Sequence, residues 1–160
     1  MITIRKILFP TDFSDNSRLA IPFVREYTQT FSAEIHVLHV LEPMVTTTDF
    51  TWAGLNFAEL EEKRRAGARE AMTQLVEELG LPAEQVVTAV ERGKTYEVVR
   101  QYVGGHEIDL VILSTHGHRG LTHLLLGSTA EMVVRTAPCP VLTVKSSLYG
   151  EPNGESGSHG

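Results

Sequence analysis

The chain has 160 residues, 42% of them hydrophobic and 21% charged, which is typical of one soluble globular domain. Its formal net charge of -6 argues against general affinity for nucleic acid or an anionic membrane. The single cysteine excludes an intramolecular disulfide and, with no signal-peptide pattern and no apolar stretch long enough to span a bilayer, indicates a cytoplasmic protein.

Five short apolar runs rich in Val and Ile predict β-strands. Most of them are continuous rather than alternating, which is typical of strands in a parallel sheet covered on both faces. In chain order they are residues 4–9, 35–41, the weaker run 86–90, 110–113 led by Ile108, and 141–144.

The segments between these runs carry helical periodicity. Residues 19–27 follow a cluster of capping residues at 14–17, and Pro22 predicts a late start or a kink. The clearest amphipathic pattern spans 68–79 and is closed by Gly80. A shorter helix over 98–103 is predicted to end at Gly104-Gly105, and the last, over 130–137, is stopped by Pro138.

Strands that alternate with helices predict right-handed crossovers and a single α/β domain with a doubly wound sheet, here over residues 1–145. The connection 46–56, which contains Phe50 and Trp52, is either a functional flap or a mobile insertion. The tail 146–160 is predicted to be disordered, because it has too few apolar residues to offset the entropy of ordering.

A loop rich in small residues follows the fourth run. Ser114, Gly117 and Gly120 let the backbone approach a ligand, and Gly127-Ser128 then opens a helix whose first N–H groups lack internal partners. These donors and the helix dipole predict an anion site that needs no lysine. The alternative is that the glycines only form turns and that Ser128 only caps its helix.

A second loop follows the first run, and it carries Asp12. A carboxylate at this place can accept hydrogen bonds from a ribose or an adenine amino group. The alternative is that Asp12 caps the helix that begins near Ser14. The sequence leaves these two interpretations balanced.

Two other motifs do not predict a site. Gly93-Lys94-Thr95 is similar to the end of a P-loop, but Thr88 stands where that motif requires a glycine, so Lys94-Thr95 is interpreted as a helix start. Three histidines cluster between residues 116 and 123, but no cysteine or carboxylate lies at ligand spacing, so no metal is expected.

Taken together, four segments resemble the universal stress protein family over residues 5–145. They are Lys6-Ile-Leu-Phe-Pro-Thr-Asp12, Leu38-His-Val40, the stretch 114–131, and Ala137-Pro-Cys-Pro-Val-Leu-Thr-Val144. Nucleotide-binding members carry Gly-x-x-Gly, nine residues, and then Gly-Ser or Gly-Thr. Gly117, the nine-residue spacing and Gly127-Ser128 match this signature, and Ser114 replaces its first glycine.

The resemblance implies a Rossmann-like, five-stranded parallel sheet of order 3-2-1-4-5 with helices on both faces. It implies a stress-response regulatory protein that binds ATP or AMP, with or without Mg²⁺, and hydrolyses ATP slowly at most. It also implies a homodimer formed through Val141–Val144, with neither nucleic acid nor membrane as a partner. The implied ligand-binding residues are Pro10, Thr11, Asp12, Val40, Ser114, Gly117, His118, Gly127, Ser128 and Thr129.

Two alternatives to this function stay open. Because Ser114 replaces a glycine, the chain is alternatively a protein-interaction module of the same fold that has lost nucleotide binding. A third interpretation is an enzyme that acts on an adenylated or phosphorylated substrate. The sequence shows neither a carboxylate pair nor an activated nucleophile near the predicted phosphate site, although fast phosphoryl transfer usually needs a metal-holding acid and a placed base.

Overall fold

The computed structural model describes residues 2–44, 56–115 and 127–145. Five strands form one parallel sheet in the order β3-β2-β1-β4-β5. Their bounds are β1 (Lys6–Pro10), β2 (Glu34–Leu41), β3 (Val86–Arg92), β4 (Leu110–Ser114) and β5 (Val141–Val144). The predicted fold class and strand order are therefore confirmed. The predicted tail at 146–160 and most of the connection 46–56 lie outside the described residues.

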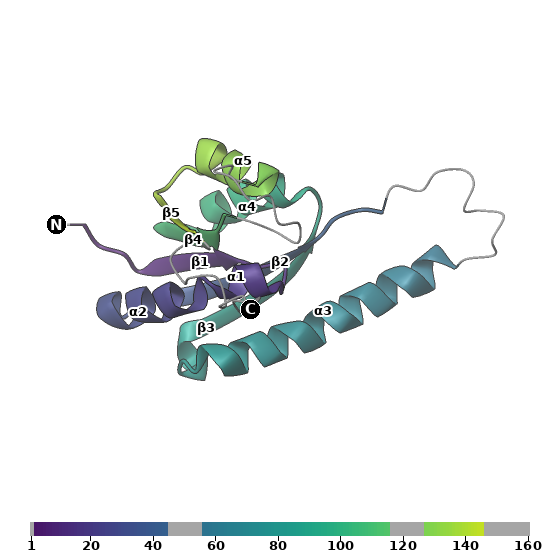
Figure 1. The fold of residues 1–160 in the computed structure, drawn as a ribbon, viewed down its shortest axis with the longest axis horizontal. Helices are drawn as coiled ribbons and strands as arrows, with labels where there is room; N and C mark the ends of the chain where they lie inside the picture. The colour runs from purple at the N-terminus through teal and green to yellow at the C-terminus, as the bar shows by residue number, and fades with distance from the viewer. Residues whose placement is uncertain (1, 45–55, 116–126, 146–160) are drawn as a thin grey trace, which may run out of the picture.

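Helices cover both faces of this sheet. They are α1 (Asp15–Arg18), α2 (Ile21–Phe31), α3 (Phe57–Leu79), α4 (Thr95–His106) and α5 (Ser128–Thr136). Figure 1 shows α2 and α3 on one side of the sheet and α4 and α5 on the other. Among the described residues, no helix is both long and apolar enough to cross a membrane.

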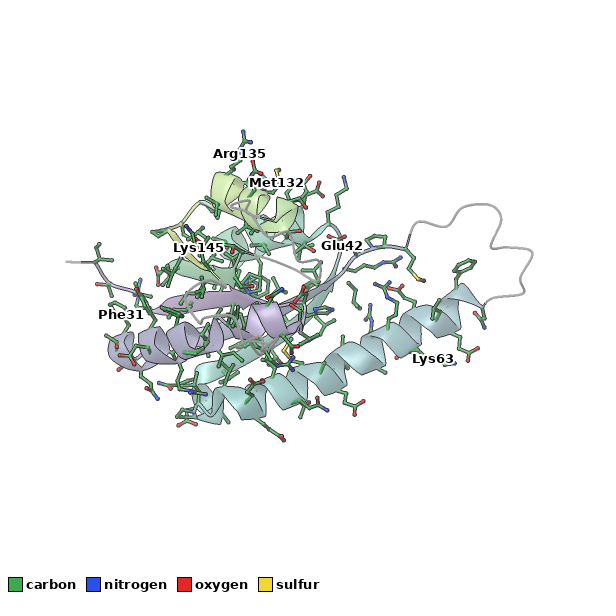
Figure 2. All side chains as sticks on the ribbon, in the orientation of Figure 1. Phe31, Glu42, Lys63, Met132, Arg135 and Lys145 are labelled. Carbon is green, nitrogen blue, oxygen red and sulfur yellow. The ribbon has the colours of Figure 1, made fainter. Side chains whose placement is uncertain are left out.

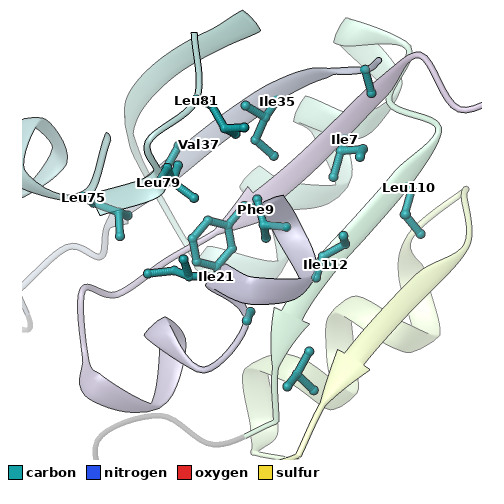
Figure 3. Packing of buried hydrophobic residues seen from close by; sticks show 14 of the residues in the cluster. Ile7, Phe9, Ile21, Ile35, Val37, Leu75, Leu79, Leu81, Leu110 and Ile112 are labelled. Carbon is teal, nitrogen blue, oxygen red and sulfur yellow. The ribbon is translucent and has the colours of Figure 1, made fainter. Parts of the chain in front are cut away.

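The apolar runs are continuous because successive strand residues point to opposite faces and both faces are covered. In β1, Ile7 and Phe9 pack beneath α2 and α3 together with Leu75, whereas Leu8 packs on the other face with Val99 of α4. All five side chains are fully buried. Figure 3 shows the first of these clusters, with Phe9 close to Ile21 and Ile112. This core holds the carboxyl ends of β1 and β4 side by side.

Pro22 has the effect that its position in the sequence predicts. Ser14 caps α1 by accepting a hydrogen bond from the Ser17 amide at 3.1 Å, and α1 ends after one turn at Arg18. A new helix, α2, then begins at Ile21 with Pro22 in its first turn, where an amide hydrogen has no intrahelical acceptor. The late start is confirmed.

The predicted end of α4 at Gly104-Gly105 is wrong. The helix continues to His106, and Glu107 takes the left-handed C-cap conformation, with φ 55° and ψ 48°. Both glycines stay helical because Val99, Tyr102 and Val103 of the same helix are anchored in the core. Tertiary packing therefore outweighs the low helix propensity of glycine.

The interpretation of Gly93-Lys94-Thr95 as a helix start is confirmed. Lys94 is the N-cap residue of α4 and Thr95 is its first residue. Gly93 has φ 148°, and a Cβ built on it would lie 2.8 Å from Cγ2 of Val98. Glycine is therefore required here for the turn into α4.

A buried polar cluster lies on the α4 face of the sheet. His36 is 3% exposed; its Nε2 lies 2.7 Å from Glu34 Oε1, and its Nδ1 lies 3.0 Å from the Tyr102 hydroxyl. The ring of His106 stacks on Tyr102 at 3.8 Å. Burial lowers the pKa of His36 below its usual 6.5, although the Glu34 hydrogen bond opposes this effect and the charges of His106 and Lys6 add to it.

This lowered pKa predicts a pH-dependent stability. Below about pH 6.5 the unfolded chain binds more protons at His36 than the folded chain does, so the free energy of unfolding falls as the pH drops through this value. We expect a His36→Gln variant to lose less stability than the parent between about pH 7.5 and about pH 5.5. Urea unfolding at several pH values measures both slopes, and parallel slopes would contradict the prediction.

Candidate functional site

A pocket of about 210 Å³ opens at the carboxyl ends of the central strands. It lies where β1 meets β2 on one side and β4 on the other, so the crossovers leave in opposite directions. In doubly wound sheets this switch point is the usual ligand site. Eight of the ten predicted ligand-binding residues line the pocket: Pro10, Thr11, Asp12, Val40, Ser114, Gly127, Ser128 and Thr129. Gly117 and His118 lie outside the described residues.

The loop after β1 is held by hydrogen bonds centred on Thr11. Its amide donates to Leu38 O at 2.9 Å, and its hydroxyl oxygen accepts from the Phe13 amide at 3.0 Å. The same hydroxyl lies 3.0 Å from that of Ser17, which also lines the pocket. Phe13 adopts φ 62°, a costly left-handed conformation for a bulky residue. These contacts fix the place of Asp12 at the pocket wall.

Asp12 does not cap the helix directly, because Ser14 is the N-cap residue. Its Oδ1 accepts hydrogen bonds from both the amide and the hydroxyl of Ser14, which closes an Asx turn. Its other carboxylate oxygen has no hydrogen-bond partner among the described residues. The cap interpretation of Asp12 is therefore wrong: its carboxylate orders the loop, and its role toward a ligand stays a prediction for this exposed residue.

The amide of Gly127 is not one of the free donors that the sequence predicts, which corrects that expectation. It donates to Thr115 O at 2.7 Å, a bond that ties the start of α5 to the end of β4. Gly127 is the N-cap residue, with φ −54° and ψ 148°, and its carbonyl accepts from the Glu131 amide. The donors left over are the amides of Ser128, Thr129 and Ala130, which have no acceptor among the described residues.

A second helix also begins at the pocket, but a carboxylate of the chain already occupies its first turn. Glu42 Oε1 accepts from the Thr95 amide at 3.0 Å and from the Thr95 hydroxyl at 2.7 Å. These two bonds hold the pKa of Glu42 below its usual value. Figure 2 shows Glu42 where β2 ends. The start of α4 is thus neutralised, and an added anion finds its free main-chain donors at α5.

Some lining residues were not predicted from the sequence: Ser17, Leu38, Thr95, Leu113, Thr115, Ala130 and Val133. Leu38 could have been predicted from the sequence, because it points to the same face of β2 as Val40, two residues away. Thr95 could not have been predicted, since no local pattern in the sequence indicates that the start of α4 lies beside the ends of β1 and β4.

Metal ligands and an activated nucleophile are not found in the described part of the chain. No group of three His, Cys, Asp or Glu side chains is placed there to hold a metal ion. Burial, with a smaller effect of Asp109, raises the pKa of the half-buried Cys139 thiol, which disfavours the reactive thiolate. Binding through main-chain donors and hydroxyls is the chemistry that the pocket offers.

Comparison with known proteins identifies relatives along nearly the whole chain. The profile of the Universal stress protein family matches residues 3–145. Universal stress protein MJ0577 of Methanocaldococcus jannaschii is 29% identical over 153 residues, covering 88% of this chain and 94% of its own. Universal stress protein A homolog 1 of Coxiella burnetii is 32% identical over 142 residues, covering 88% and 95%.

Solved structures agree with these sequence matches. Universal stress protein UspA from Lactobacillus plantarum superposes with a TM-score of 0.75 at 26% identity, covering 89% of this chain and 98% of its own. The structure of MJ0577 gives a TM-score of 0.74 at 27% identity, covering 90% and 97%. The profile match, the sequence relatives and the shared fold lead to one conclusion: this chain belongs to the universal stress protein family.

Proposed function

We propose that the chain binds ATP or AMP in the pocket at the carboxyl ends of β1, β2 and β4 and acts as a nucleotide-dependent regulator in the stress response. The observation that carries this proposal is the free first turn of α5, which faces the same pocket as the exposed carboxylate of Asp12. An anion-binding end and a hydroxyl-accepting end in one pocket suit a nucleotide.

In this proposal the two ends of the pocket bind different parts of the nucleotide. Adenine and ribose would lie against Pro10, Thr11, Asp12 and Val40. The phosphates would accept hydrogen bonds from the Ser128 and Thr129 amides, with Ser128 adding its hydroxyl. Gly117 and His118 are proposed to complete the ribose and phosphate site, in line with the family signature.

Ser114 fits this proposal although it replaces the first signature glycine. It is the last residue of β4, pairs with Val144 and is half-buried. Its φ is not positive, so its backbone needs no glycine. Its hydroxyl has no partner among the described residues, and the residue lines the pocket. The serine thus offers a ligand one more polar group.

One related structure is a universal stress protein in complex with cAMP, with a TM-score of 0.62 at 18% identity. At that identity the likeness shows the shared fold, so the chemistry proposed for this chain rests on its own pocket. Among the described lining residues, Asp12 carries the one carboxylate and is assigned to the ribose, so a nucleotide-bound Mg²⁺ would be held by the phosphates and not by a described carboxylate. A single acid without a placed base supports slow hydrolysis at most.

The test of this proposal is the chemical identity of what the protein holds. Gently purified protein is denatured, and its released small molecules are separated by chromatography. We expect an adenine nucleotide, and we expect ATP or AMP to raise the melting temperature of the emptied protein. If neither result is obtained, the protein-interaction module without nucleotide becomes the better account. Turnover well above that of a Gly127→Val variant would favour an enzyme.

We further propose a cytoplasmic homodimer that pairs through β5. The carbonyls of Pro140 and Val144 accept from the amides of Val111 and Thr115, so the alternate residues Val141 and Thr143 turn their main-chain groups to the open edge. Antiparallel pairing of two copies across a two-fold axis would satisfy that edge. We expect Thr143→Pro to shift the sedimenting species from dimer to monomer, because proline removes an outward N–H that β4 does not use.

A further inference from the structure

A groove of about 570 Å³ runs between α3 and the edge strand β3, on the far side of the sheet from β5. Figure 1 shows that α3 turns back into β3, so the two elements run in opposite directions. Thr88, Ala89 and Val90 form the strand side of the groove. Ala89 packs against the α4 face of the sheet and Val90 against the α3 face, so the groove includes the open edge of the strand.

The main-chain groups along this edge have a defined direction. The Gly93 amide donates to Leu41 O of β2 at 3.2 Å. Alternate residues of a parallel strand turn toward the same neighbour, so Ala89 faces β2 while Thr88 and Val90 turn their N–H and C=O groups outward. No described residue makes a hydrogen bond to these outward groups. The groove therefore offers a row of free donors and acceptors.

The side chains of β3 do not protect this edge. Residues 86–90 read Val-Val-Thr-Ala-Val, an uncharged run of strand-forming residues, and none of them is fully buried. Natural edge strands are usually shortened, charged or covered, because an exposed flat edge pairs with other chains. Charge appears only at the end of the strand, at Glu91 and Arg92. The run 86–90 is therefore suited to pairing with an added strand.

Charged groups of α3 give the groove a polarity. Arg65 and Arg69 line it, and neither guanidinium has an ion-pair or hydrogen-bond partner among the described residues. Glu77 lines it eight residues after Arg69, about 12 Å along the helix. Arg92 contacts Glu61 at 3.6 Å, which places the arginine end of the groove beside the end of β3. The groove thus has one position for an acidic residue, at Arg65 and Arg69, and one for a basic residue, at Glu77. The two positions lie about four strand residues apart.

We propose that the groove is a docking site for an extended segment of a partner protein, which adds a strand to β3. Main-chain hydrogen bonds to Thr88 and Val90 give the affinity, and side chains on one face of the segment give the specificity. The segment carries an acidic residue opposite Arg65 and Arg69 and a basic residue four positions away, opposite Glu77. This pattern distinguishes it from an arbitrary strand-forming peptide.

The test uses the full chain carrying Thr143→Pro, so that pairing through β5 does not interfere. The probes are the capped peptides Thr-Glu-Val-Thr-Val-Lys-Thr and Thr-Lys-Val-Thr-Val-Glu-Thr, which present the two charges in both orders. We expect one order to bind, with saturable fluorescence anisotropy below about 1 mM. A peptide with lysine at both charged positions should bind about 10-fold more weakly, because it meets Arg65 and Arg69 with like charge.

Two protein variants separate the contribution of main-chain pairing from the contribution of charge. Thr88→Pro removes an outward N–H without touching the β2 ladder and should abolish binding of both peptides. Arg69→Ala should weaken binding of the preferred Glu/Lys peptide about 10-fold and leave the double-lysine peptide unaffected or slightly improved. Arg100→Ala, an exposed arginine on α4, is the matched control and should bind as the parent does. Circular dichroism verifies that each variant is folded. If Thr88→Pro does not fold, the result with Arg69→Ala decides the test.

Three results would overturn the proposal. The first is no binding of either charge order at about 1 mM. The second is equal binding of the double-lysine peptide, or binding that Arg69→Ala does not change. The third is self-association of the Thr143→Pro chain that Thr88→Pro abolishes, because the occupant of the edge would then be a second copy of this chain.

Discussion

Gly127→Val should weaken ATP binding about 100-fold, a loss of about 2.7 kcal/mol. The glycine lines the pocket directly before the free amides of Ser128 and Thr129. Valine adds three carbon atoms where a phosphate must approach those amides. Its backbone conformation, φ −54° and ψ 148°, is open to valine, so we expect the fold to persist. Isothermal titration calorimetry with ATP measures the loss.

Gly67→Val is the matched control for this variant. Gly67 lies in α3, away from the pocket, and a Cβ added to it meets nothing within 4 Å. The Gly67→Val variant should therefore bind ATP as tightly as the parent does. If Gly127→Val, folded by circular dichroism, also kept the parent affinity, the phosphates would not lie at the start of α5 and the proposed site would be wrong.

Phe9→Ala should cause the largest loss of stability, about 3–5 kcal/mol. Phe9 is fully buried near the carboxyl end of the central strand β1, beneath α2 and α3 (Figure 3). Its removal leaves a cavity that neighbours on three elements would have to fill. Domains are typically stable by about 5–15 kcal/mol, so this one change removes a large part of the total. Urea unfolding followed by circular dichroism measures it.

The control for the core variant is the same substitution at an exposed phenylalanine. Phe31 ends α2 and is 38% exposed (Figure 2). Its ring centroid lies 5.9 Å from that of Tyr27, and the two ring planes are tilted by 42°. Phe31→Ala should cost less than about 1 kcal/mol. A loss at Phe9 no larger than that at Phe31 would contradict the packing described for β1. Because Pro10 and Thr11 follow Phe9 directly, we also expect Phe9→Ala to weaken nucleotide binding.

The two edges of the sheet suit different partners for a physical reason. β5 has four residues and, by our proposal, pairs with its own copy, whereas β3 has seven and lies beside a helix that carries Arg65 and Arg69. An isologous contact is self-complementary, and a charged groove selects a partner of opposite pattern. The nucleotide pocket lies between these edges, at β1 and β4, so either association leaves its mouth free of strand pairing.

The sequence by itself determined the local elements and the chain's family. Continuous runs of Val and Ile specify buried parallel strands because both of their faces must be apolar, as Ile7, Leu8 and Phe9 are. Proline and glycine mark boundaries where their backbone limits decide the outcome, as at Pro22 and Gly80. The set of predicted ligand-binding residues came from the resemblance to the family, and eight of its ten members line the pocket.

Only the tertiary structure decided which groups at that edge are free. The Gly127 amide is taken by Thr115 O, and the first turn of α4 is taken by Glu42, which lies 53 positions before Thr95 in the chain. The groove between α3 and β3 and the persistence of α4 through Gly104-Gly105 depend likewise on packing between elements. A local pattern cannot encode these outcomes, because each one depends on how the whole core brings distant residues together.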